Sequence, residues 1–246
     1  MYALIVSHGQ PSDPGPAETA LARLALRIAR HLPGWSVQSA TMAMPGRLEV
    51  QARQSPPGTH VYPLFMADGW FVRTRLRQRL NGHDMAFCPP LGLEPGLPAL
   101  AAGLLTQQAH RQGWEINQTP VVLPAHGSAR SDLAAQATRD FADRLQPLIP
   151  DTPLHLGFVE QAPSITQAAT GHGSRAISLP FFAAAGGHAL EDVPQELDAA
   201  QFTGQRLPVL GLAPGIPALI ADSLRAAQAS AAASRAKDSI PAQSPA

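Results

Sequence analysis

The sequence has few of the residues on which several functional classes depend. Only one of its 246 residues is cysteine, Cys88, which excludes an internal disulfide and a zinc site built from several cysteines. Lysine occurs once, at Lys237, and 18 basic residues are balanced by 18 acidic ones, so no nucleic-acid partner is expected. No apolar run approaches the roughly 20 residues that span a bilayer, and the run at 2–6 is too short for a signal peptide. We therefore expect a cytoplasmic globular protein with no membrane span.

The chain contains an internal duplication. A His-Gly pair that follows a short apolar run occurs at His8 and again at His126, 118 positions later. Two further pairs of segments match in the same order, namely 61–65 with 178–182 and 91–100 with 210–219. Ordered matches at nearly one spacing indicate a tandem repeat. We predict two halves at 1–113 and 118–229, followed by a disordered tail at 230–246.

Each half alternates strand-like runs with helical runs. Strands are expected at 2–6, 36–42, 59–64, 84–87, 120–124, 153–159, 175–180 and 206–210. Helices are expected at 16–31, 46–54, 72–80, 95–111, 131–146, 163–170, 191–200 and 215–229. Strands joined by helix-length crossovers indicate parallel sheets with helices on both faces. The predicted fold class is α/β, with two similar lobes that face each other across a cleft, each a four-stranded parallel sheet flanked by helices.

Polar side chains gather at the expected carboxyl ends of the second half's strands. His126 ends its first strand, Glu160 ends its second, and His188 follows its third. Ligands of such sheets bind at this edge, so the three side chains can converge. Two imidazoles and a carboxylate can bind Fe, Co, Ni or Zn, and they can also accept protons near neutral pH.

The first half lacks most of this set. His8 is the partner of His126, but counting from the matching prolines places Phe71 opposite His188 and Met42 opposite Glu160. This asymmetry is typical of a duplicated enzyme in which one copy keeps the chemistry. We therefore predict one active site per chain, with His8 as a possible accessory residue.

These motifs resemble those of the two-halved, CbiX-type sirohydrochlorin chelatases, which belong to the class II chelatases. The matching segments, in family order, are 123–128, 157–165, 179–182 and 186–194, with weaker matches in the first half at 7–9, 63–65 and 69. The resemblance implies a chelatase-like fold. It also implies ATP-independent insertion of Co²⁺ or Fe²⁺ into sirohydrochlorin or a related tetrapyrrole, in cobalamin or sirohaem biosynthesis.

The resemblance also assigns roles to residues. His126, His188 and Glu160 are implied as catalytic residues and metal ligands, and Asp192 as an accessory residue. No cofactor is implied beyond the divalent metal substrate, which is Co²⁺, Fe²⁺ or Ni²⁺. The partners are then a tetrapyrrole and a metal ion, and the chain acts as a monomer or homodimer.

A tetrapyrrole of this kind is a flat ring with acidic side chains, so it needs apolar walls and cations at its edge. The candidate contacts are Trp70, Phe71, Phe181 and Phe182 for the walls and Arg73, Arg75, Arg77 and Arg79 for the edge. For the aromatic residues the alternative interpretation is core packing. For the arginines it is a solvated helix face.

Three other functions remain open from the residues alone. A non-enzymatic tetrapyrrole or metal-ion carrier would keep the same site and lack turnover. A metal-dependent hydrolase is another α/β enzyme, although the sequence has no aspartate-rich metal motif, Gly-x-Ser-x-Gly motif or phosphate-binding loop. A structural protein would leave the polar triad of the second half unexplained.

Overall fold

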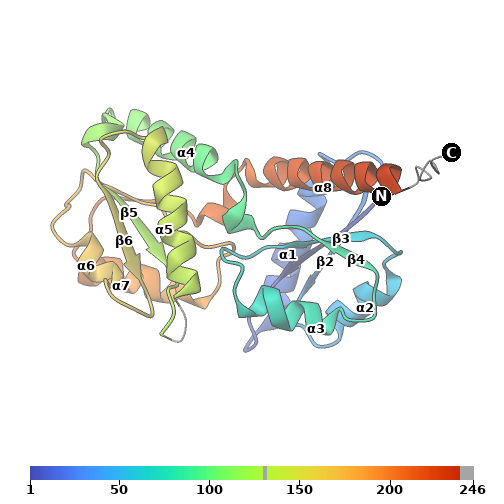
Figure 1. Cartoon of the computed structure of the whole chain (residues 1–246). Helices are drawn as coiled ribbons and strands as arrows, with labels where there is room; N and C mark the ends of the chain where they lie inside the picture. The colour runs from blue at the N-terminus through green and yellow to red at the C-terminus, as the bar shows by residue number, and fades with distance from the viewer. Residues whose placement is uncertain (130–131, 239–246) are drawn as a thin grey trace.

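The computed structural model describes residues 1–129 and 132–238, and every predicted strand and helix has a counterpart there (Figure 1). The strands are β1 (Tyr2–Ser7), β2 (Ser36–Thr41), β3 (Thr59–Pro63), β4 (Met85–Phe87), β5 (Val121–Ala125), β6 (Leu154–Phe158), β7 (Ile177–Ser178) and β8 (Gln205–Arg206). The α-helices are α1 (Pro14–Ala29), α2 (Arg47–Gln54), α3 (Arg77–Arg79), α4 (Leu97–Arg111), α5 (Leu133–Leu145), α6 (Ile165–Ala169), α7 (Val193–Ala199) and α8 (Ile216–Asp238). Two π-helices, Phe71–Leu76 and His188–Asp192, lead directly into α3 and α7.

The strands form two parallel sheets with the same topology. Their strand orders are β2-β1-β3-β4 and β6-β5-β7-β8, which confirms the predicted α/β class with two lobes. In each sheet the first strand has its second and third strands on opposite sides. The crossover to the second strand and the crossover to the third therefore run in opposite directions along the sheet. The carboxyl ends of the first and third strands form the topological switch point, where such sheets bind ligands.

The last helix of each half packs on the other lobe. Helix α4 contacts α5, whereas α8 contacts α1 and β3, and Figure 1 shows α8 lying along the first lobe. The two lobes thus exchange their last helices. A Cβ on Gly96 would lie 2.8 Å from Leu219, and one on Gly215 would lie 2.8 Å from Leu100, so these glycines permit close packing where the exchanged helices begin. The lobes in space therefore differ from the halves in sequence at these two helices.

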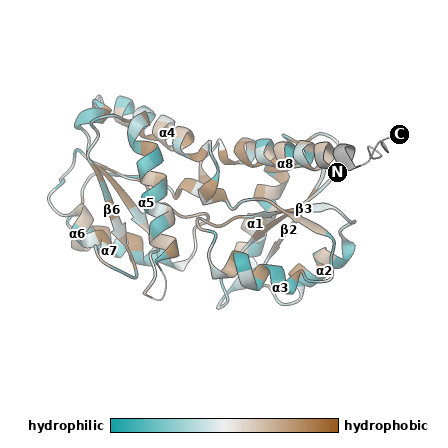
Figure 2. Cartoon of the chain, viewed as in Figure 1, coloured by the Kyte–Doolittle hydropathy of each residue, from teal (hydrophilic) through white to brown (hydrophobic). Residues whose placement is uncertain are grey.

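One hydrophobic core runs through both lobes. It contains Ile5 and Tyr62 from the first sheet, Leu123 from the second, and residues such as Leu105 and Ile220 from the exchanged helices. Along α5 hydrophobic and hydrophilic residues alternate, as expected for a helix with one buried face (Figure 2). Within 1–129 and 132–238, no helix combines the length and hydropathy needed to cross a membrane.

The predicted disordered tail begins too early. Helix α8 continues to Asp238, so residues 230–238 are helical. Four of these nine residues are alanine, which has the highest helix propensity and extends a helix already packed on the first lobe. The rest of the predicted tail, 239–246, lies outside the described residues.

Candidate metal centre

The second lobe brings the three predicted ligands together. One ligand atom each from His126, Glu160 and His188 lie within 4.8 Å of one another. Three donors bound tetrahedrally at about 2.1 Å from one ion would be about 3.4 Å apart. The side chains are 44%, 39% and 44% exposed, so small rotations can close this distance. The arrangement is an open site reached from solvent.

Both histidines are held in a form that can bind a metal. Nδ1 of His126 lies 3.0 Å from the carbonyl oxygen of Gly127. Nδ1 of His188 lies 2.6 Å from a carboxylate oxygen of Asp192. Each of these oxygens can only accept, so each Nδ1 must donate its proton, which leaves Nε2 with a free lone pair in the neutral ring. Both rings therefore present Nε2 as the available ligand atom.

The π-helix positions Asp192 for this contact. His188 and Asp192 are its first and last residues, and the carboxylate fixes both the tautomer and the orientation of the ring. Carboxylate–histidine pairs of this kind are the usual support of histidine ligands in metal sites. Asp192 thus supports a ligand and is not one of the three converging groups.

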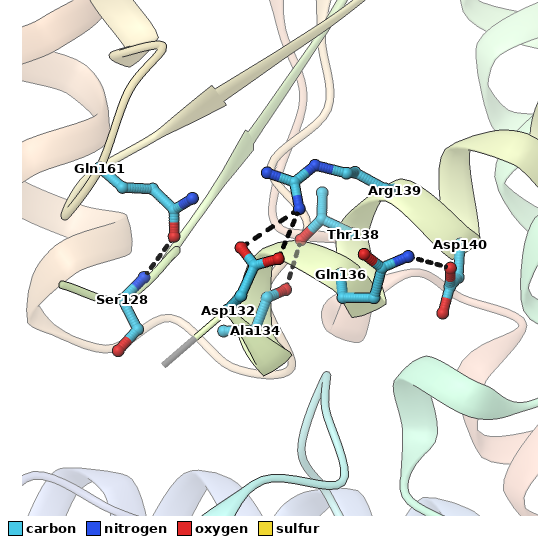
Figure 3. Close-up of polar contacts among 8 residues, drawn as sticks. All are labelled: Ser128, Asp132, Ala134, Gln136, Thr138, Arg139, Asp140 and Gln161. Carbon is cyan, nitrogen blue, oxygen red and sulfur yellow. Dashed lines mark hydrogen bonds and ion pairs between the residues drawn. The ribbon is translucent and has the colours of Figure 1, made fainter. Parts of the chain in front are cut away.

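The loop after His126 is anchored by the residue next to Glu160. The backbone N–H of Ser128 donates to Oε1 of Gln161 at 2.8 Å (Figure 3). Gly127 has φ +65°, and a Cβ there would lie 2.8 Å from Gln161 Cγ, so only glycine fits without a shift. These contacts bring the ends of β5 and β6 together, and with them His126 and Glu160.

The first lobe has the same backbone arrangement as the metal site, but with different side chains; we call this shared arrangement the frame. The His8 and Phe71 rings meet edge to face at 4.4 Å and 78°, and the His126 and His188 rings do so at 4.5 Å and 75°. Nδ1 of His8 also lies 2.9 Å from the carbonyl oxygen of the following glycine. Phe71 is therefore the counterpart of His188, as predicted.

The predicted counterpart of Glu160 is wrong by one residue. The backbone N–H of Glu160 bonds to the His126 carbonyl, and in the first lobe Ala43 makes the same bond to His8. The first-lobe loop is one residue shorter before its proline, so counting back from the proline shifts the alignment to Met42. Ala43 therefore stands where Glu160 stands in the second lobe.

Comparisons with known proteins show which family the chain belongs to. The family model for CbiX matches residues 120–227, a range that contains all three candidate ligands. A solved structure described as CbiX, the terminal enzyme of sirohaem biosynthesis in denitrifying bacteria, is 44% identical. The match covers 92% of this chain and 99% of that one, with a TM-score of 0.84. The chain belongs to the CbiX family.

More distant structures share the fold alone. SirB from Bacillus subtilis with Fe³⁺ is 15% identical over 94% of this chain and 97% of its own, with a TM-score of 0.71. The multi-domain DR2241 from Deinococcus radiodurans is 18% identical over 92% of this chain and 54% of its own, with a TM-score of 0.67. None of the curated proteins compared with the chain matches it.

Two of the predicted ring contacts are core residues in this CbiX-family chain. Phe181 is 2% exposed and packs on Phe141, with ring centroids 4.4 Å apart, and Phe182 is 8% exposed in the core beside Val193. They lie three and four residues after β7, where the backbone still pairs with β5, and their side chains alternate onto the two faces of the sheet. The expectation that they form ring walls is therefore corrected. Trp70 and Phe71, by contrast, are 57% and 41% exposed.

The four arginines between positions 73 and 79 make different contacts. Arg79 forms a two-pronged ion pair with Glu49 at 2.7 and 2.9 Å, which lowers the pKa of that carboxyl and leaves the arginine structural. Arg77 stacks on Phe87, with its guanidinium carbon 4.2 Å from the ring centroid. Arg73 and Arg75 remain exposed, Arg75 beside Trp70 and Arg73 in an ion pair with Asp68. Only these last two fit the predicted role at the ring edge.

We call the loops and π-helix at the carboxyl ends of each lobe's strands its rim. The rims of the two lobes meet beside the site. A Cβ on Gly187 would lie 3.4 Å from Nε2 of Gln10, so the first-lobe loop after His8 touches the loop before His188. Neither Gln10 nor Gln161 is predictable from the sequence, because a single glutamine in a loop carries no signal without the structure. Arg75 matches Asp192, at the same spacing of 117 that separates Phe71 from His188.

Proposed function

We propose that this chain is a sirohydrochlorin chelatase, which inserts Co²⁺ or Fe²⁺ into sirohydrochlorin or a related tetrapyrrole in sirohaem or cobalamin biosynthesis. The observation that supports it most directly is the convergence of His126, Glu160 and His188 at the switch point of the second sheet. Membership of the CbiX family indicates which reaction this cluster supports. The first lobe has only His8 of the set, so we infer one active site per chain.

The site suits a metal that must be delivered and not kept. Structural metal sites are closed by four protein ligands, whereas three ligands leave a position open for water or substrate. His126 and His188 would bind the ion through Nε2, and Glu160 would offset its charge. An exposed, incomplete ligand set allows the ion to pass to the pyrrole nitrogens.

Insertion also requires two protons to leave the ring. Each pyrrole N–H bond breaks heterolytically, its electron pair stays on nitrogen, and the nitrogen then binds the metal ion. The proton acceptors within reach of the metal are the Glu160 carboxylate and an imidazole that has released the ion. Side chains placed in this way as general bases commonly accelerate proton transfer about 10²- to 10⁴-fold.

The reaction needs no cofactor beyond its metal substrate and no ATP in this proposal, and it takes place in the cytoplasm. The chain would act as a monomer or as a homodimer. The duplication supports the monomer, because it supplies within one chain the two lobes that single-lobe proteins would form by pairing.

The test is anaerobic metal insertion into sirohydrochlorin, followed by the change in absorbance. Wild type and His188→Ala are compared with the rate without protein, using Co²⁺, Fe²⁺ and Ni²⁺ in parallel. We expect wild type to accelerate insertion with Co²⁺ or Fe²⁺ and His188→Ala to return to the background rate. Wild-type rates equal to background with every metal would contradict the proposal, and ring or metal binding without turnover would then indicate a carrier.

A further inference from the structure

Two exposed aromatic residues distinguish the rim of the first lobe. Trp70 and Phe71 are 57% and 41% exposed, and their rings meet edge to face at 5.2 Å. Contiguous exposed apolar surface, unlike single exposed apolar residues, is typical of ligand and interaction sites. The Phe71 ring also contacts the His8 ring, so the aromatic surface extends to the first-lobe histidine.

Two cations flank these rings. The guanidinium carbon of Arg75 lies 5.4 Å from the centroid of the Trp70 ring, which orients this side chain without neutralising it. Arg73 Nε lies 2.9 Å from Asp68, yet its side chain is 60% exposed and has further N–H groups to donate. Among the described residues, no carboxylate forms an ion pair with Arg75. We name Trp70, Phe71, Arg73 and Arg75 the first-lobe patch.

The matching positions of the second lobe have different chemistry. Opposite Trp70, Phe71, Arg73 and Arg75 stand Gly187, His188, Leu190 and Asp192. One rim therefore presents metal ligands and a carboxylate, and the other presents aromatic rings and guanidinium groups. Since the rims touch at Gln10 and Gly187, a ligand between them would meet both.

We propose that the first-lobe patch binds the flat face and the carboxylates of the tetrapyrrole, and that it selects an acid-rich ring over a ring with few carboxylates. This inference rests on the proposed function. The aromatic rings stack on the macrocycle, and the two guanidinium groups pair with its acidic side chains. The first lobe thus recognises the ring, while the second lobe holds the metal.

The experiment measures ring binding without metal, so that it does not depend on turnover. Metal-free sirohydrochlorin is titrated by fluorescence into full-length wild type, the double variant Arg73→Gln/Arg75→Gln, and the matched control Arg77→Gln. Arg77 lies on the same helical segment but stacks on Phe87, away from the patch. A dicarboxylic porphyrin is titrated in parallel, and Co²⁺ alone reports on the second lobe.

We expect the double variant to bind sirohydrochlorin about tenfold more weakly or worse, the loss typical of charge-assisted contacts. Its preference for sirohydrochlorin over the dicarboxylic porphyrin should shrink by the same factor, whereas Co²⁺ binding and the Arg77→Gln control stay within about twofold of wild type. An unchanged affinity in the double variant, or an equal loss for both rings, overturns the inference. If wild type inserts metal normally and the double variant binds the ring as tightly as wild type, only the proposed role of the first-lobe patch is refuted. If wild type binds the ring selectively but does not insert metal, only the proposed chelatase activity is refuted.

Discussion

The rims of the two lobes show how one frame can support two kinds of surface. Each has a histidine after its first strand, in edge-to-face contact with an aromatic ring at the start of a π-helix. The ring spacings agree within 0.1 Å, at 4.4 and 4.5 Å. The ligand positions differ, because the second lobe has Glu160 and His188 where the first has Ala43 and Phe71, and the first-lobe loop is one residue shorter before its proline. The backbone that places the two rings in contact therefore keeps its form although the first lobe lacks two of the three metal ligands.

The π-helices sharpen this comparison. Such helices are rare and occur often at functional sites. The first lobe retains its π-helix at Phe71–Leu76 although that helix has no metal ligand, and Arg75 replaces the aspartate that supports His188. The π-helix is therefore a property of the duplicated scaffold, and the metal chemistry uses it without creating it.

The largest effect should separate the two equivalent histidines. His126→Ala removes a metal ligand and a proton acceptor, so we expect the rate of metal insertion to fall by about 100-fold or more. His8→Ala removes the equivalent histidine of the first lobe, and we expect the rate of metal insertion to fall by only a few-fold. Equal losses in the two variants would mean that both rims take part in the chemistry.

A smaller effect should come from the support of His188. Asp192→Asn keeps the size of the side chain but weakens its hold on Nδ1, and changes of this kind typically cost about 10- to 100-fold in metal affinity or activity. Titration with Co²⁺ and the insertion rate measure the two quantities. Glu191→Gln, at the neighbouring position of the same π-helix, is the matched control and should behave as wild type.

The comparison can also be reversed. Ala43→Glu with Phe71→His gives the first lobe the ligands of the second, and Arg75→Asp adds the support for the new histidine. We expect the triple variant to bind two Co²⁺ per chain, and the double variant to bind the second ion about 10- to 100-fold more weakly because it lacks the support. Metal analysis after dialysis gives the stoichiometry. One ion per chain in the triple variant would show that the first-lobe backbone has lost the metal-binding geometry.

Much of the fold follows from the sequence because parallel strands buried on both faces appear as short apolar runs. Residues 3–6 and 121–125 are such runs; His126 follows the second run directly, and His8 follows the first after Ser7. The exchange of α4 and α8 could not be predicted, since an apolar helix face shows that it is buried but not on which of two similar sheets. The burial of Phe181 and Phe182 depends on how far β7 extends along β5, which is a tertiary contact.

The candidate site was predictable for the same reason. His126 and Glu160 come within two residues of the carboxyl ends of their strands, and His188 lies in the segment that follows the third strand, so all three can gather at one edge of the sheet. The match of Arg75 with Asp192 also follows from the sequence, through the spacing of 117 that pairs Phe71 with His188. The match of Ala43 with Glu160 does not, because the loops that carry these two residues differ in length by one residue. Side chains placed by loops of unequal length are therefore the part of such a site that the sequence alone does not determine.

The smallest effect concerns acid stability, which should differ between the lobes. His155 on β6 stacks against His172, with ring centroids 4.2 Å apart, and burial, followed by the nearby His172, lowers the pKa of His155. The folded state therefore resists protonation of His155, whereas the unfolded chain takes up the proton near pH 6.5. The stability that the neutral ring provides is complete above this pH and is lost as the pH falls from 6.5 through the lower, folded-state pKa. The matching first-lobe position is Gln38.

The substitution His155→Gln copies the first lobe and removes the titrating group. Urea unfolding at pH 7.5 and 5.5 should show that wild type loses more free energy of unfolding on acidification than the variant does. We expect the difference to be at most about 1 kcal/mol, because the ring is partly exposed and solvent screens its interactions. If both proteins lose the same amount, the His155–His172 pair does not set the acid stability of the second lobe, and the groups common to both lobes must account for it.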